Sequence, residues 1–119
     1  MAAFQTSMNN LSMSNSVTTF TASEFGRRLS NNGTGTDHGW GNIQLVMGGA
    51  VQGGTTYGTW PSLQLDGPDA VNTGRLIPTS SNHQLAATLA QWMGVQQQAE
   101  QINILPQLAN FNTPTIDLF

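Results

Sequence analysis

The residues with the clearest chemical potential lie in and before one glycine-rich stretch, "GTGTDHGWGN". Asp37 and His38 are adjacent in this stretch, and Glu24 lies thirteen positions ahead of Asp37. Carboxylate oxygens and imidazole nitrogens are ligands that zinc, manganese and similar divalent ions take in proteins. The glycines would allow the sharp backbone turns that such a site needs. From the residues alone, two interpretations stay open: a metal-binding corner of an enzyme, or a mobile polar loop.

Two predicted strands flank these residues. The β-branched segment "VTTFTA" predicts a buried strand over residues 17–22, of the kind found in parallel sheets. The segment "QLVMGGAV" predicts a second strand over residues 44–51. Residues 24–42 between them are expected to form a long loop with a helical turn at its start. Because ligands collect beyond the carboxyl ends of strands in open α/β sheets, we expect Glu24 and His38 to approach each other there.

A helix is predicted downstream of the strands. Ser81 and Gln84 have the spacing of a capping box, and Gly94 fits a left-handed helix end. The apolar residues between them fall at i, i+4, i+7 and i+8, which predicts a core-facing stripe of Leu85, Leu89, Trp92 and Met93. A weaker helix is predicted over residues 96–103. Strand, loop, strand and helix in this order indicate an α/β fold.

A further helical pattern opens the chain. Phe4, Met8 and Leu11 share one face of a helix predicted over residues 2–12. No capping residue precedes this helix, so we expect it to continue from upstream sequence.

Charge is scarce along the chain. The 119 residues carry a net charge of −3, and charged residues make up 8%, against about 25% in an average soluble domain. Nucleic acid is excluded as the main partner because phosphate neutralisation needs a basic face. No apolar run approaches the roughly 20 residues of a membrane span, and no signal peptide is visible. The absence of cysteine excludes disulfides and thiolate metal sites. The low charge favours a surface that further protein covers.

Four motifs and their joint spacing resemble the C-terminal part of the 1501 family of domains of unknown function. This family is described as sulfatase-like and is grouped with the alkaline phosphatase and sulfatase superfamily. The resemblance covers roughly residues 16–112. The motifs are Glu24-Phe25-Gly26-Arg27, then Asp37-His38 with Trp40, then Met47-Gly48-Gly49-Ala50-Val51 with Gly53-Gly54, and finally Trp92-Met93-Gly94-Val95.

The resemblance implies the C-terminal portion of a three-layer α/β/α sandwich of the alkaline phosphatase and sulfatase type. Superfamily members hydrolyse sulfate or phosphate esters with metal ions held by Asp, Glu and His at strand ends, where a typical sequence is Ser-Asp-His-Gly. In one alignment, Asp37-His38-Gly39 is this element. In the other, Ser23-Glu24-Phe25-Gly26 takes that position and His38 is a later ligand. We prefer the second because a strand directly precedes Glu24, although Phe25 then replaces a His ligand.

The implied site therefore consists of Glu24, Asp37 and His38 as ligands of a divalent metal (zinc, manganese or calcium). Asp37 could instead accept a hydrogen bond that orients the His38 ring. Arg27 is expected to bind an oxyanion of the substrate, because a guanidinium matches sulfate or phosphate geometry. The substrate would be a small-molecule or saccharide ester of the parent protein.

The superfamily's nucleophile lies early in its members' chains and has no counterpart here. The 119 residues are therefore expected to form one partial domain, inactive alone, of a larger hydrolase. Family relatives often carry a twin-arginine export signal, which implies a periplasmic or secreted parent protein.

Two other functions stay open. Trp40, Tyr57 and Trp60 lie among glycines and could stack on sugar rings, as in a carbohydrate-binding module. A structural remnant without a working site is the third interpretation. Metal affinity would distinguish the hydrolase from both, and binding that depends on Trp40 or Trp60 but not on metal would indicate the module.

Overall fold

The structure is a computed structural model that describes all 119 residues as a mixed α/β chain. The chain divides into two compact units. The first, here called the ribbon unit, comprises Met1–Gly53 and Thr59–Thr79, and the second, the helical unit, comprises Gly54–Gly58 and Ser80–Phe119. No helix has the length and apolar character needed to cross a bilayer.

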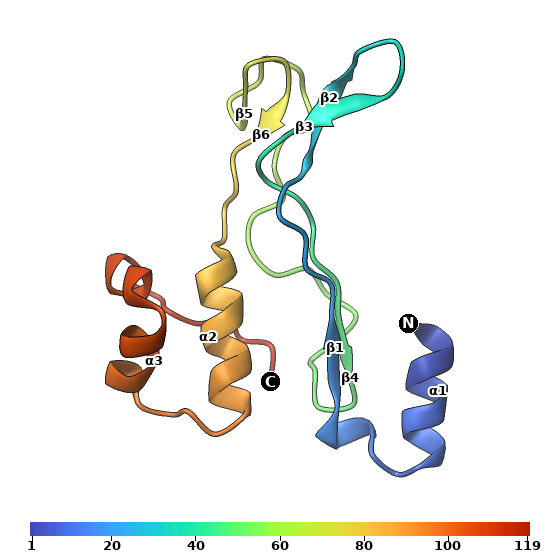
Figure 1. Ribbon diagram of the computed structural model, residues 1–119, viewed down its shortest axis with the longest axis vertical. Helices are drawn as coiled ribbons and strands as arrows, with labels where there is room; N and C mark the ends of the chain where they lie inside the picture. Colours follow the sequence, from blue (N-terminus) through green and yellow to red (C-terminus); the bar gives the residue numbers. More distant parts are fainter. The chain divides into compact units, whose positions relative to one another are not determined.

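The N-terminal part of the ribbon unit contains one helix and one two-stranded ribbon (Figure 1). Helix α1 (Ala2–Asn10) leads through the 3-10 turn η1 (Ser14–Ser16) to strand β1 (Thr18–Phe20). Strand β1 pairs with β4 (Val46–Gly48) in antiparallel register. The helix and both strands were predicted, although each strand has only three residues. The expectation of a buried, parallel strand was wrong: β1 pairs with one antiparallel neighbour only, and Phe20 is exposed.

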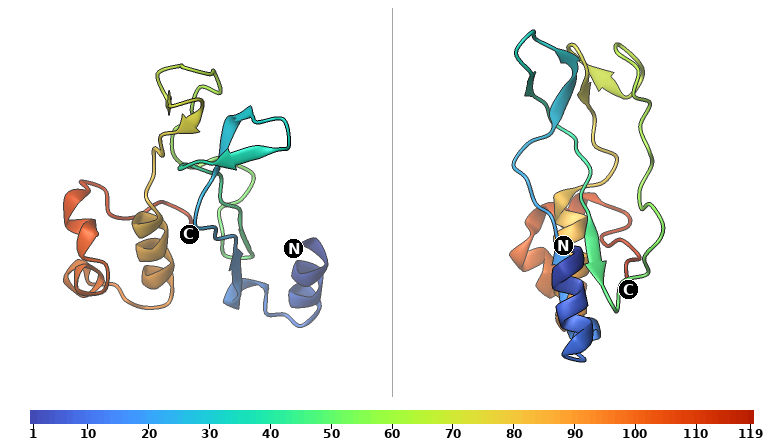
Figure 2. Two further views of the ribbon diagram at one scale, coloured as in Figure 1. Left: turned by 45° about the horizontal axis from the view of Figure 1, so that its top comes forward. Right: turned by 90° about the vertical axis from the view of Figure 1, so that its right-hand side faces the viewer.

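The predicted long loop over residues 24–42 is instead a β-hairpin. Its strands are β2 (Arg27–Asn31) and β3 (Thr36–His38), and no helical turn forms at its start. A second small hairpin, β5 (Ala70–Val71) and β6 (Arg75–Leu76), lies beside it (Figure 2). The Leu29 N–H donates to the Gly74 carbonyl at 2.9 Å, which ties the two hairpins together.

Close backbone contacts take the place of a side-chain core in the ribbon unit. Ala70 is its one fully buried hydrophobic side chain. Gly26 and Gly41 are buried where two segments cross, and a Cβ at Gly26 would lie 1.9 Å from the Gly41 carbonyl oxygen. The Gly41 N–H in turn donates to the Leu76 carbonyl at 2.9 Å. Glycine is therefore required at this crossing, because any side chain would separate the segments.

The helical unit has a small core of its own. Helix α2 (Asn82–Trp92) precedes α3 (Gln98–Ile104) and the 3-10 turn η2 (Pro106–Asn110). The predicted capping box is confirmed: Ser81 Oγ accepts from the His83 N–H, and the Gln84 side chain accepts from the Ser81 N–H at 2.9 Å. Gly94 has φ +107°, as expected for a left-handed helix end.

The predicted apolar stripe of α2 is only partly right. Met93 is exposed, and the other three members are half-buried. The fully buried positions are instead Ala87 and Thr88. The covered face is rotated because the C-terminal residues hydrogen-bond to polar side chains of α2. The buried side chains of the unit are Ala87, Thr88, Gln101, Leu108 and Leu118.

Candidate functional site

Three of the four predicted site residues lie on the β2–β3 hairpin. The turn between the strands contains Gly33 and Gly35, both with positive φ. Asn32 stabilises the turn, since its side-chain oxygen accepts from the Thr34 N–H at 3.0 Å. The register places Arg27 opposite His38. The hairpin thus brings together residues that are eleven positions apart in sequence.

One face of the hairpin carries His38, Phe25 and Arg27. The His38 and Phe25 rings are stacked, with centroids 3.8 Å apart and an interplanar angle of 19°. The Arg27 guanidinium carbon lies 5.3 Å from the Phe25 ring centroid, within cation–π range. Arg27 also donates to the Thr36 carbonyl at 2.8 Å. Both Arg27 and His38 are exposed, so a ligand could reach either group.

The glycine crossing positions this face. The Gly26 N–H donates to the Trp40 carbonyl at 3.1 Å, and the Gly39 N–H donates to the Gly26 carbonyl at 2.7 Å. These bonds join the residues that immediately precede Arg27 and follow His38. Phe25 is thereby held against the His38 ring.

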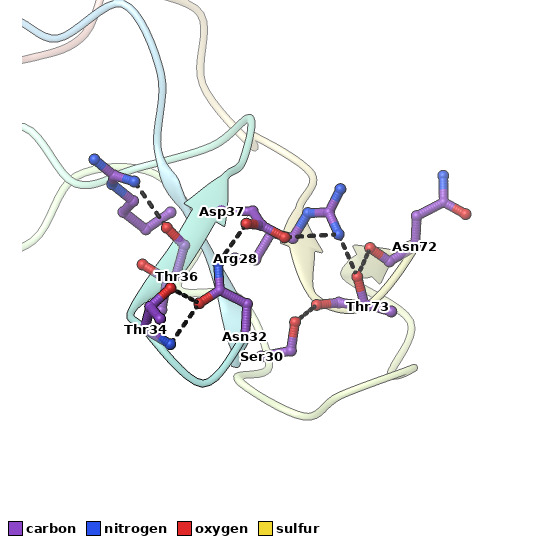
Figure 3. Close-up of polar contacts among 9 residues, drawn as sticks. Arg28, Ser30, Asn32, Thr34, Thr36, Asp37, Asn72 and Thr73 are labelled. Atoms are coloured by element: carbon purple, nitrogen blue, oxygen red, sulfur yellow. Dashed lines mark hydrogen bonds and ion pairs between the residues drawn. The ribbon is translucent and has the colours of Figure 1, made fainter.

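Asp37 belongs to the opposite face of the hairpin, because successive side chains of a strand alternate. Its carboxylate accepts from the Asn32 side-chain amide at 2.6 Å and lies 3.6 Å from an Arg28 guanidinium nitrogen. Arg28 also donates to the Thr73 hydroxyl at 2.8 Å, and Ser30 donates to the Thr73 carbonyl. Figure 3 shows Asp37 between Asn32 and Arg28, with Thr73 beyond. Asp37 therefore acts here as a link between the hairpin turn and the neighbouring turn.

The structure does not bring the three predicted metal ligands together. Glu24 is exposed ahead of β2, and Asp37 and His38 face opposite sides of β3. The chain contains no group of three or more His, Cys, Asp or Glu residues that could hold a metal ion. These residues alone do not fit a metal centre, and Asp37 does not contact the His38 ring to orient it.

Several residues of this site were not singled out from the sequence. Arg28, Asn32 and Thr73 hold Asp37 and the hairpin turn, and Phe25 supports His38. The Asn32-Gly33 pair is a common hairpin turn sequence and could have revealed the hairpin. Thr73 has no comparable sequence signal, because it reaches Arg28 across 45 positions.

The aromatic residues of the alternative carbohydrate site differ in exposure. Trp40 is 61% exposed and Trp60 is 56% exposed, and both belong to the ribbon unit. Tyr57 is half-buried and belongs to the short segment assigned to the helical unit. Two of the three predicted aromatic rings are therefore accessible to a ligand.

The comparisons with known proteins give one match. A family profile described as "Protein of unknown function (DUF1501)" matches residues 1–105. This range contains the hairpin, the glycine crossing and helix α2. No curated protein and no solved structure matches the chain.

Proposed function

The chain belongs to the DUF1501 family of proteins of unknown function, and on that premise we propose that it is an oxyanion-binding part of a sulfatase-like or phosphatase-like hydrolase. Arg27 and His38 would bind the sulfate or phosphate group of an ester substrate. The observation that carries this proposal is that both side chains lie on one exposed face of the β2–β3 hairpin.

The chemistry of the two side chains suits an oxyanion. A guanidinium presents several N–H donors in a plane and stays charged at neutral pH. An imidazole ring donates from one nitrogen and can bind a metal ion through the other, and the stack on Phe25 leaves the ring edge of His38 available for both contacts. Neither group attacks an ester in this role. The proposal therefore assigns substrate binding to this hairpin and leaves the nucleophile to other parts of the enzyme.

We propose that the hydrolase depends on a divalent metal ion. This chain would supply only some of the ligands of that ion. Glu24 and His38 are both exposed and could each supply one ligand to a zinc, manganese or calcium ion. Further ligands would be needed, because the chain forms no complete metal-binding group. When bound, such a metal would polarise the ester oxygens and stabilise developing negative charge.

We further propose that the chain is the C-terminal portion of a three-layer α/β/α sandwich, in a periplasmic or secreted parent protein. The supporting observation is the shortage of core in the ribbon unit, which leaves many large apolar side chains exposed. Large apolar side chains left exposed in this number would be buried if further layers of protein covered the ribbon unit. The exposed residues of this kind are Met1, Phe4, Leu11, Met13, Phe20, Trp40, Ile43, Leu45, Trp60, Leu63, Leu65 and Val71.

Calorimetric titration with inorganic phosphate and sulfate tests the proposed binding site. We expect saturable binding that Arg27→Ala weakens by about tenfold, because the charged hydrogen bonds are lost. His38→Ala should weaken binding as well, whereas His83→Ala, in the helical unit, should not. Equal binding by all four proteins, or none by the unaltered chain, would contradict the proposal.

A parallel titration with zinc and manganese tests metal dependence. Binding that His38→Ala removes and His83→Ala leaves would support a ligand role for His38. Metal binding that persists in His38→Ala would argue against it.

A carbohydrate-binding function is a second candidate, favoured by the exposed Trp40 and Trp60 rings. Exposed tryptophans offer flat apolar faces for stacking on sugar rings. Titration with oligosaccharides would distinguish this candidate, since binding should then depend on Trp40 and be unaffected by Arg27→Ala.

A further inference from the structure

The turn between β2 and β3 contains the only Asn-Gly pair of the chain, Asn32-Gly33. The backbone nitrogen of Gly33 follows directly on an amide side chain, and the glycine has no side chain of its own to shield it. Attack of this nitrogen on Cγ of Asn32 would close a five-membered succinimide ring. Residues 31–35 are all exposed, so water reaches the amide and would reach such a ring.

Two donors from Thr34 hold the carbonyl group that would be attacked. The Asn32 side-chain oxygen accepts from the Thr34 N–H at 3.0 Å and from the Thr34 hydroxyl at 3.1 Å (Figure 3). Attack on Cγ moves negative charge onto this oxygen. Donors that already point at an oxygen stabilise the charge that develops there, as in the oxyanion hole of an acyl-transfer enzyme. Thr34 therefore stabilises the tetrahedral intermediate of this attack.

The leaving group and the attacking nitrogen also have polar partners. The Asn32 side-chain nitrogen donates to the Asp37 carboxylate at 2.6 Å. This nitrogen must take up a proton before it leaves, and a neighbouring carboxylate stabilises the cation that results. The Gly33 N–H donates to the Asn31 side-chain oxygen, which polarises the bond that must lose its proton. Each group that changes charge in the reaction therefore has a partner of matching polarity.

We propose that Asn32 is a self-modification site, at which the turn promotes deamidation of its own side chain. The Gly33 nitrogen bonds to Cγ of Asn32 and passes its proton to water. The bond between Cγ and the side-chain nitrogen then breaks, and that nitrogen, protonated by water, leaves as ammonia. Water next hydrolyses either carbonyl–nitrogen bond of the succinimide and gives aspartate or isoaspartate. The net reaction consumes water, releases ammonia and involves no oxidant or reductant.

Deamidation would change how the turn is held. A carboxylate at position 32 would face the Asp37 carboxylate where an amide now donates to it, so repulsion would replace the hydrogen bond. Arg28 would remain the partner of Asp37. The isoaspartate product would also lengthen the backbone of the turn. The modified turn would be less firmly tied to β3, while the glycine crossing at the other end of the hairpin would keep its hydrogen bonds.

Incubation of the folded chain in mildly alkaline buffer tests the proposal, with peptide mapping by mass spectrometry at successive times. Asn32 is expected to convert first to the succinimide, with loss of ammonia, and then to the two acids. Asn72 is the internal control, because it also lies in a hairpin turn but precedes Thr73, whose branched side chain hinders attack. Conversion of Asn72 as fast as that of Asn32, or no conversion of Asn32, would contradict the proposal.

Thr34→Val measures the contribution of the turn to the reaction. The variant lacks the hydroxyl that donates to the Asn32 oxygen, and conversion should slow by about tenfold, as expected for one lost hydrogen bond to a developing charge. Thr36→Val is the matched control, because it removes a hydroxyl of the same hairpin that does not donate to Asn32. Equal rates in the two variants would mean that Thr34 does not assist the reaction, against the proposal.

Comparison with the unfolded chain is the decisive test. The unfolded sample is kept in guanidinium chloride, and the folded sample contains sodium chloride at the same ionic strength. Asn32 should convert faster in the folded chain, because only the fold holds Thr34 and Asp37 against its amide. Faster conversion in the unfolded chain would show that the turn protects the amide and would overturn the proposal. Either result leaves the proposed role of Arg27 and His38 unaffected.

Discussion

The ribbon unit and the helical unit are stabilised in different ways. In the ribbon unit, glycines allow backbone segments to approach directly, and hydrogen bonds between those segments replace a core. In the helical unit, buried side chains such as Leu108 and Thr88 pack between α2, η2 and residues 113–119. The ribbon unit therefore leaves many side chains exposed, where they can bind ligands. The helical unit instead buries side chains in a core of its own. The difference explains why the candidate site lies in the unit with less core.

Among the substitutions that test this comparison, a change at Gly26 should cause the largest loss of stability. A Cβ at this position would lie 1.9 Å from the Gly41 carbonyl oxygen, and backbone cannot move aside as a flexible side chain can. We expect Gly26→Ala to lower the free energy of unfolding by about 4 kcal/mol, at the upper end for a single substitution. Chemical denaturation measures the loss, and NMR should show the largest shifts around His38.

Gly53→Ala is the matched control for this prediction. A Cβ there would meet nothing closer than the Val51 carbonyl oxygen at 3.9 Å. If both variants unfold at the same denaturant concentration, the crossing does not hold the ribbon unit together.

Truncation of Leu108 tests the opposite kind of stabilisation. This side chain is 0% exposed, so Leu108→Ala removes packed atoms and leaves a cavity. We expect the free energy of unfolding to fall by about 3 kcal/mol. Denaturation monitored by the helical circular dichroism signal measures this loss. Ile104→Ala, at a residue that is 65% exposed, should cost little. Equal losses from the two variants would show that the unit lacks a specific core.

The two units also differ in how well the sequence predicted them. Helix α2 was predicted because its signals are local: Ser81, Gln84 and Gly94 lie within one helix length. The buried face of α2 was misplaced, since it depends on residues about 28 positions away, as in the Thr88–Ile116 hydrogen bond. Local patterns therefore predicted the element but not the partner that it packs against.

The hairpin was missed for two reasons. The Asn32-Gly33 turn signal was interpreted as part of a long loop, and the base of the hairpin is closed by backbone contacts between residues far apart in sequence. Gly26 meets Gly41 across fifteen positions, and no side-chain periodicity records such a contact. The sequence singled out Arg27 and His38 as candidate binding residues but could not show that they share one face. It also could not show that Asp37 and His38, adjacent in sequence, face apart.

Removal of the α2 cap is expected to have a moderate effect. Ser81→Ala deletes the hydroxyl that accepts from the His83 N–H at 3.1 Å and leaves that donor without a protein partner. The free energy of unfolding should fall by about 1 kcal/mol, a typical value for an N-cap residue. Thermal unfolding measures the change, with Ser80→Ala as the control. A larger loss from Ser80→Ala would mean that the capping box contributes little.

The smallest effect is expected at the ion pair on the hairpin. The Asp37 side chain is 51% exposed and that of Arg28 is 21% exposed, so solvent screens their attraction across 3.6 Å. Asp37→Asn should lower the free energy of unfolding by about 0.5 kcal/mol, and added salt should reduce the difference between the two proteins. Denaturation at low and high ionic strength measures both quantities. The variant also separates two roles of the hairpin, because Arg27 and His38 lie on the other face and their phosphate binding should persist. Loss of that binding in Asp37→Asn would instead mean that the two faces act together, and that the turn held by Asn32 and Asp37 is needed to present the oxyanion-binding residues.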